Sequence, residues 1–93
     1  MITNTLLIKL NRYEELEKTK FTLLSMKGKI PVLKYLQVET DIRRGTSSYD
    51  ILLITKFNSL KDMETYLSDP VHLEVSKYIA TVMVSGASVC YED

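Results

Sequence analysis

Two segments of this sequence are apolar on both faces of an extended strand, and this feature restricts the possible folds more than any other. Between residues 49 and 57, Ile51, Leu53 and Phe57 share one face, and Leu52 and Ile54 share the other. The segment from residue 2 to residue 10 likewise carries a leucine at position 7, opposite its remaining apolar side chains. Because successive side chains of a strand alternate between faces, a sheet built from these segments needs cover on both sides.

The intervening segments carry apolar residues at helical spacing. Leu16, Thr19, Leu23 and Met26 fall on one side of a helix that has acidic residues early and lysines late, as the helix dipole favours. The predicted strands cover residues 2–10, 33–42, 49–57 and 83–91, and the predicted helices cover residues 12–27, 60–67 and 71 to about 81. This order, βαββαβ with right-handed crossovers, predicts an α+β, ferredoxin-like sandwich with both helical layers on one face of a four-stranded sheet.

Short polar motifs mark the predicted helix starts. Asn11 is placed to cap the first helix, and Ser59 with Asp62 three residues later resembles a capping box. Asp69 followed by Pro70 predicts another helix start, with the aspartate as N-cap and the proline at the first helical position.

The apolar back of the sheet predicts a homodimer. Both helical layers cover the same face, yet Leu7, Leu52, Ile54 and either Val84 or Val89 place apolar side chains on the other. Burying one such side chain is worth roughly 1.5–3 kcal/mol, and an exposed cluster of them usually marks an interface. A second copy packed sheet to sheet would close a dimeric α/β barrel around a two-fold axis. The alternative is a monomer with scattered surface leucines.

Composition narrows the classes of function. Residues 1–93 fit a single domain of ordinary globular composition. Positive and negative charges balance, which disfavours a nucleic-acid partner, and no apolar run is long enough for a membrane span. One cysteine excludes an internal disulfide, and with one histidine it cannot build a zinc site. No metal and no cofactor are expected, and the cytoplasm is the expected location.

Several stretches together resemble the stress-responsive dimeric α/β barrel (Dabb) family over almost the whole chain. They are Asn4 to Leu10, Lys29-Ile30-Pro31, Tyr49 to Ile54, Phe57-Asn58-Ser59, the specific stretch Tyr66-Leu67-Ser68-Asp69-Pro70-Val71-His72, and Tyr91-Glu92. The resemblance implies a ferredoxin-like dimeric barrel. A few members are cyclases that act on polyketides, and related folds include antibiotic-type monooxygenases. The pocket tyrosine of the cyclases matches Tyr66, and their general-base histidine matches His72. Asn4 stands where the family usually carries a histidine.

The candidate site combines one base with two neutral hydrogen-bond donors. His72 falls in the first turn of a helix, whose positive end favours a neutral imidazole, the form that a general base needs. Tyr66 can donate its hydroxyl to a developing oxyanion, and Asn4, on the helix side of the first strand, can add a second hydrogen bond. The alternative is structural: the histidine fixes a loop, the tyrosine packs its ring, and the asparagine satisfies a strand edge. Cys90 is expected to be a small buried hydrophobe.

Three functions remain open. The first is a homodimeric domain that binds a small apolar or aromatic metabolite between sheet and helices without chemistry of its own. The second is a cofactor-independent cyclase or oxygenase that uses His72 as general base with Tyr66. The third is a structural or interaction module whose dimer is its whole role. An open apolar cavity that His72 faces would favour binding, whereas a space closed by packed side chains would favour the third function.

Overall fold

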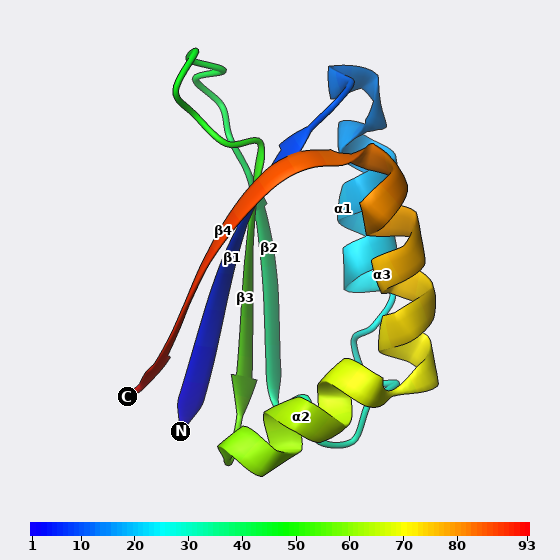
Figure 1. Ribbon diagram of the computed structural model, residues 1–93, viewed down its shortest axis with the longest axis vertical. Helices are drawn as coiled ribbons and strands as arrows, with labels where there is room; N and C mark the ends of the chain where they lie inside the picture. The colour runs from blue at the N-terminus through cyan, green and yellow to red at the C-terminus, as the bar shows by residue number, and fades with distance from the viewer.

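A computed structural model describes residues 1–93 as one four-stranded sheet with helices on a single side. Figure 1 views the sheet edge-on, with α1 and α3 stacked against one face and α2 crossing near one end. The elements are β1 (Ile2–Leu10), a 3₁₀ turn at Tyr13–Glu15, α1 (Leu16–Leu24), β2 (Tyr35–Thr40), β3 (Ile51–Phe57), α2 (Leu60–Ser68), α3 (Pro70–Val82) and β4 (Met83–Glu92). The α+β ferredoxin-like fold predicted from the element order is therefore confirmed. None of the helices is long and apolar enough to cross a membrane.

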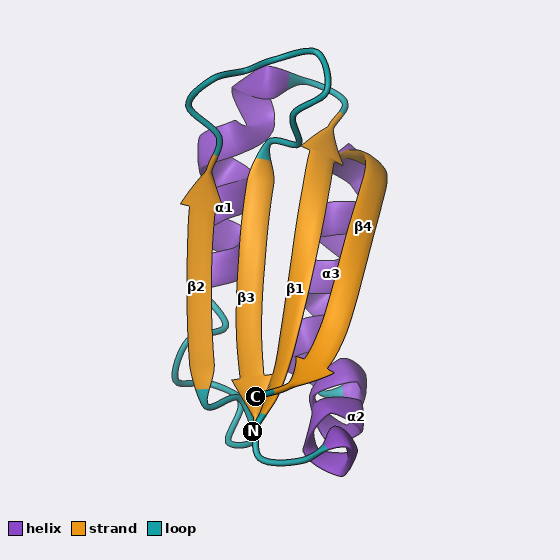
Figure 2. Cartoon of the chain, turned by 90° about the vertical axis from the view of Figure 1, so that its left-hand side faces the viewer, coloured by secondary structure: helices purple, strands orange, loops and turns teal.

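The sheet is antiparallel throughout, with the strand order β2-β3-β1-β4 (Figure 2). The first strand in the sequence lies at the centre, between β3 and β4. Leu6 faces Leu53 of β3 and Ser88 of β4, and Ile8 faces Ile51 and Gly86. This register places the alternate residues of β1 that begin with Ile2 on the helix-covered face, as the sequence pattern predicted.

The hydrophobic core fills the space between the sheet and the helices. Ile8, Phe57 and Met26 are its most completely buried large apolar side chains. Each comes from a different element, so the core joins the central strand, its β3 neighbour and the chain that follows α1. Burying side chains of this size contributes roughly 1.5–3 kcal/mol apiece, which makes this layer the main source of the stability of the fold.

The opposite face of the sheet has no helix over it (Figure 2). Leu7, Leu52 and Ile54 lie there, only partly covered by their neighbours. Val89 pairs with Thr5 of β1 and so belongs to the same face, where it is 62% exposed. We call this surface the open face. The sequence left a choice between Val84 and Val89, and the register decides for Val89.

A β-bulge explains why the face of the last strand could not be read from its sequence. Ser85 pairs with Lys9 and Met83 pairs with Leu10, so Val84 has no partner on β1. The extra residue shifts the alternation between Met83 and the rest of β4. Gly86 follows the bulge, where a β-carbon would lie 3.2 Å from the carbonyl oxygen of Leu7. The glycine thus permits a close approach of two strands.

The predicted helix starts are correct at two places and wrong at one. The Ser59 hydroxyl accepts a hydrogen bond from the Asp62 amide at 3.1 Å, and the Asp69 carboxylate accepts one from Val71 at 2.8 Å. Asn11, predicted as a cap, instead donates to the carbonyl oxygen of Thr81 at the end of α3. The first helix is also shorter than predicted, since regular α-helix ends at Leu24 and is followed by turns.

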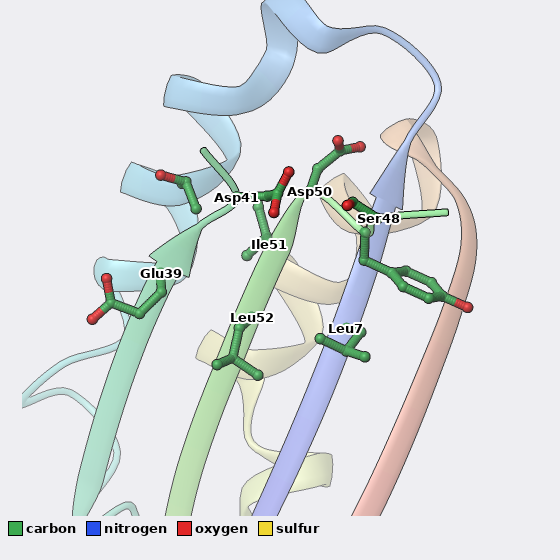
Figure 3. A pocket seen from close by; sticks show the side chains of 9 residues that line it. Leu7, Glu39, Asp41, Ser48, Asp50, Ile51 and Leu52 are labelled. Carbon is green, nitrogen blue, oxygen red and sulfur yellow. The ribbon is translucent and has the colours of Figure 1, made fainter. Parts of the chain in front are cut away.

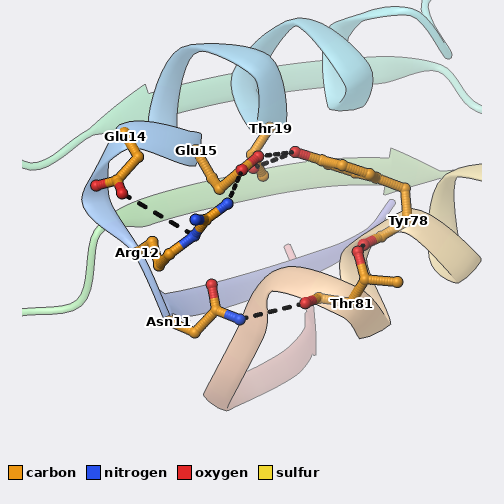
Figure 4. Close-up of polar contacts among 7 residues, drawn as sticks. All are labelled: Asn11, Arg12, Glu14, Glu15, Thr19, Tyr78 and Thr81. Atoms are coloured by element: carbon orange, nitrogen blue, oxygen red, sulfur yellow. Dashed lines mark hydrogen bonds and ion pairs between the residues drawn. The ribbon is translucent and has the colours of Figure 1, made fainter.

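A polar network holds α3 against the start of α1 (Figure 4). The Tyr78 hydroxyl lies 3.1 Å from the carboxylate of Glu15 and 3.1 Å from the hydroxyl of Thr19. Arg12 pairs with the same carboxylate at 2.9 Å. Thr19 is fully buried, so Tyr78 supplies the partner that its hydroxyl needs. The network therefore ties α3 to the start of α1.

Candidate functional site

A cavity of about 210 Å³ lies between β1 and α3, on the helix-covered side of the sheet. Ten of its thirteen lining residues are hydrophobic, and none is a lysine, an arginine, an aspartate or a glutamate. The lining consists of Asn4, Leu6, Ile8, Leu23, Met26, Leu53, Tyr66, Leu67, His72, Val75, Ser76, Ile79 and Met83. All three residues predicted from the sequence, Asn4, Tyr66 and His72, therefore line one space.

His72 is held in one orientation by its own helix junction. Its Nδ1 lies 3.0 Å from the carbonyl oxygen of Leu67, the penultimate residue of α2. A carbonyl oxygen only accepts hydrogen bonds, so Nδ1 carries the proton and Nε2 keeps a free lone pair. Burial lowers the pKa of His72, although the hydrogen bond to Leu67 and the charge of Asp69 act in the opposite direction. The ring is thus a neutral acceptor at pH 7.

Tyr66 is deeply buried and its hydroxyl is already engaged. The ring packs against Phe57 with centroids 4.9 Å apart and against His72 at 4.4 Å. The hydroxyl donates to the sulfur of Met26 at 3.8 Å, a weak hydrogen bond. Burial raises the pKa of Tyr66 to about 12. The hydroxyl therefore keeps its proton under ordinary conditions and acts as a donor, since a thioether is easily exchanged for a better acceptor.

Asn4 and Ser76 complete the polar part of the lining. Asn4 lies in β1 between Thr55 of β3 and Cys90 of β4, on the face that the helices cover. Ser76 follows His72 by four residues in α3, so both side chains lie on the same side of that helix. Ser76 was not among the residues predicted from the sequence. The four-residue spacing from a candidate base is the signal that would have found it.

The β4 side of the cavity is lightly covered. Gly86, Ser88 and Cys90 pair with Ile8, Leu6 and Asn4, so these three small residues share the helix-facing side of the sheet. All three are exposed. The prediction of a buried Cys90 is wrong: the thiol is free and exposed, and its sulfur lies 3.7 Å from that of Met63. The cause is that α3 leaves this edge strand without cover.

A second hollow, of about 270 Å³, lies on the open face at the end of β2 and β3 (Figure 3). Leu7 and Leu52 form its apolar part, and Glu39, Asp41 and Asp50 its acidic part. The carboxylate of Asp50 accepts a hydrogen bond from the Leu10 amide at 2.8 Å and lies 3.7 Å from the Lys9 ammonium. Asp50 therefore anchors the long loop to β1. No group of three or more His, Cys, Asp or Glu side chains is arranged to hold a metal ion.

The fold and the cavity together define a class: ferredoxin-like α+β domains with an apolar space between sheet and helices and an uncovered sheet face. Within this class, the chain belongs to the stress responsive A/B barrel domain family, whose model matches residues 2–91. The resemblance noted in the sequence is thereby confirmed. No curated protein sequence matches the chain.

Several solved structures share this fold. A dimeric protein of unknown function with a ferredoxin-like fold from Bacteroides fragilis is 26% identical, with a TM-score of 0.87, and the match covers 99% of this chain and 95% of that one. A dimeric ferredoxin-like protein of unknown function from Thermobifida fusca is 19% identical, with a TM-score of 0.87 and coverage of 99% and 90%. A hydroxynitrile lyase from Passiflora edulis shares the fold at 12% identity, with a TM-score of 0.82 and coverage of 97% and 90%.

Proposed function

We propose that this chain is a homodimeric domain that binds a small apolar or aromatic molecule between its sheet and its helices. The observation that carries the proposal is the cavity: about 210 Å³ of mostly apolar space that His72, Asn4 and Ser76 border with polar groups. Binding sites typically combine an apolar lining with a few placed polar groups. A domain whose only role was to dimerise would have no need of such a space in its core.

The homodimer part of the proposal rests on the open face. Leu7, Leu52, Ile54 and Val89 form an apolar surface on the side of the sheet without helices. Similar structures from Bacteroides fragilis and Thermobifida fusca are described as dimeric. A second copy of the chain would bury this surface.

The exposed thiol of Cys90 bears on the location of the protein. A free thiol at the surface is typical of a reducing compartment, such as the cytoplasm.

Titration with benzyl alcohol, followed by amide and imidazole chemical shifts, tests binding. The expected result is a saturable shift at His72, Ser76 and Asn4. Ser76→Phe, which places a ring at an exposed position bordering the cavity, is expected to abolish the shift. Lys77→Phe, at the next exposed position of α3 but outside the lining, is the matched control and should bind like the wild type. Absence of a saturable shift at millimolar concentration would contradict the proposal.

A second candidate function is proton abstraction next to a carbonyl, with His72 as general base and Tyr66 as a hydrogen-bond donor. The hydrogen bond from Nδ1 to Leu67 favours it, because that bond leaves Nε2 free and oriented. A structure of the same fold is described as a hydroxynitrile lyase, which indicates that the fold can host an enzyme.

Deuterium incorporation into phenylacetone tests this second function. Nε2 would take a proton from the carbon between ring and carbonyl, and a deuteron from the solvent would replace it. The expected result is faster exchange with the wild type than in buffer. His72→Gln keeps a side-chain amide that can donate to Leu67 and should return the rate to background. Equal rates for both proteins would exclude the base role and leave binding untouched.

A further inference from the structure

The electrostatics of the cavity restrict the chemical class of its ligand. A cavity that binds a carboxylate or phosphate normally presents an arginine, a lysine or free backbone amides. None of the thirteen lining residues is cationic. An anion that entered would leave water without gaining a counter-charge, at a substantial cost in free energy.

The start of α3 is the one other feature that would attract an anion. Here the protein already occupies it with its own carboxylate. The side chain of Asp69 accepts the amide of Val71 at 2.8 Å, and its carbonyl oxygen accepts the amide of Leu73 at 2.9 Å. The positive end of the helix dipole is thus balanced by a negative charge close to His72. This charge repels a second anion.

The imidazole of His72 favours a neutral ligand that donates a hydrogen bond, whereas Asn4 and Ser76 can pair with a donor or an acceptor. Nε2 of His72 is an acceptor, since Nδ1 holds the proton in its bond to Leu67. A ligand that meets it needs an O–H or N–H group. The volume of about 210 Å³ exceeds the roughly 150 Å³ of an engineered apolar cavity that holds benzene. One substituted ring therefore fits.

We infer that the cavity selects uncharged molecules of about single-ring size that donate a hydrogen bond to Nε2 of His72, and that it excludes carboxylates and phosphates. This inference rests on the proposed binding function and specifies its ligand class. Alcohols, phenols and amides are within the class. Acids of the same shape are outside it.

The test compares benzamide with benzoate, two molecules of the same shape that differ in charge. At pH 7.5 we expect calorimetry to show benzamide binding at least about tenfold more tightly, because charge burial without a partner is costly. Ser76→Lys, which adds a cation at the border of the cavity, should strengthen benzoate binding by about tenfold through a charge-assisted contact. Ala80→Lys, at an exposed α3 position outside the lining, is the matched control and should leave both affinities unchanged.

The outcomes separate this inference from the binding function. Benzoate binding as tight as benzamide, or tighter, would overturn the charge selection while ligand binding itself stands. An equal increase in benzoate affinity from Ser76→Lys and from Ala80→Lys would also overturn it, because the effect would then not arise in the cavity. Failure of benzamide, benzoate and benzyl alcohol alike would overturn both proposals.

Discussion

The imidazole of His72 and the phenol ring of Tyr66 lie with their centroids 4.4 Å apart and their planes tilted by 51°, yet their polar atoms engage different partners. The histidine donates to the backbone of Leu67, and the tyrosine donates to the sulfur of Met26. The contact between the two is therefore one of ring packing. The hydrogen bond to Leu67, and not this packing contact, leaves Nε2 as the nitrogen that can accept a hydrogen bond from a ligand.

The single histidine predicts a loss of stability in weak acid. Burial lowers the pKa of His72 in the folded state below the ordinary value of 6.5. The unfolded chain therefore binds a proton more readily, and the free energy of unfolding falls as the pH drops below 6.5 toward the folded-state pKa. Urea unfolding between pH 5 and pH 7.5 measures this slope.

His72→Gln should flatten that slope, because the variant lacks the imidazole whose pKa is lowered on folding. The imidazole Cε1 proton, unique in this sequence, reports the folded-state pKa directly by NMR. A value at or above 6.5, or an unchanged slope in the variant, would contradict the description of the ring as half-buried and neutral.

The buried phenol of Tyr66 leads us to expect that the fold also loses stability in alkali. Its pKa is raised to about 12 in the folded state, so it stabilises the fold fully below pH 10 and loses this contribution as the pH rises from 10 to 12. Over these two pH units the free energy of unfolding should fall by about 2–3 kcal/mol. We expect Tyr66→Phe to cost less than about 1 kcal/mol at pH 7, because only a weak bond to sulfur is lost.

The same variant should be more resistant than the wild type above pH 10, as judged by urea unfolding. Tyr35→Phe is the control, since Tyr35 is exposed and bonds to Gln37 at the surface. If both variants show the alkaline behaviour of the wild type, Tyr66 is not the buried phenol that the structure describes.

The open face predicts an oligomeric state that one charge can change. Sedimentation of the wild type should give about twice the 10.7 kDa of one chain. Leu52→Glu places a charge in the middle of the apolar surface, and burying it without a partner is strongly unfavourable, so this variant should sediment as a monomer. Leu60→Glu, on an exposed position of α2, should remain dimeric. A monomeric wild type would leave the apolar open face without explanation.

The network between α1 and α3 predicts a coupled pair of substitutions. Tyr78→Phe leaves the fully buried hydroxyl of Thr19 without a partner, which should cost about 1–3 kcal/mol. Thr19→Val removes that hydroxyl, so adding Tyr78→Phe in its presence should cost less than Tyr78→Phe does in the wild type. Equal costs in the two backgrounds of a double-mutant cycle would indicate that the two hydroxyls do not depend on each other.

Much of this fold was accessible from the sequence because local signals and the global arrangement agree. The two apolar faces of residues 51–57 predicted correctly a strand at that place, and the Asp69-Pro70 pair marked the start of α3 correctly. The cavity residues His72 and Tyr66 were found through a family motif, since nothing local distinguishes a histidine that lines a cavity from one that fixes a loop.

The remaining features depend on long-range geometry. Asn11 has the chemistry of a cap, but the end of α3 comes within reach and its carbonyl at Thr81 takes the hydrogen bond instead. Cysteine is a residue type that is usually buried. Cys90 is nevertheless exposed, because its strand lies at the edge of the sheet, where α3 does not cover it. The bulge at Val84 decides which face the last strand presents, and a bulge leaves little trace in a single sequence.

The central place of β1 sets the order in which this molecule can assemble. This strand pairs on one side with residues some fifty positions away and on the other with residues some seventy to ninety positions away. Closing such long loops slows folding relative to local structure. The β3 edge of β1 can pair as soon as residues 51–57 have been made, but the β4 edge stays open to chaperones and neighbouring chains until residues 83–92 have followed.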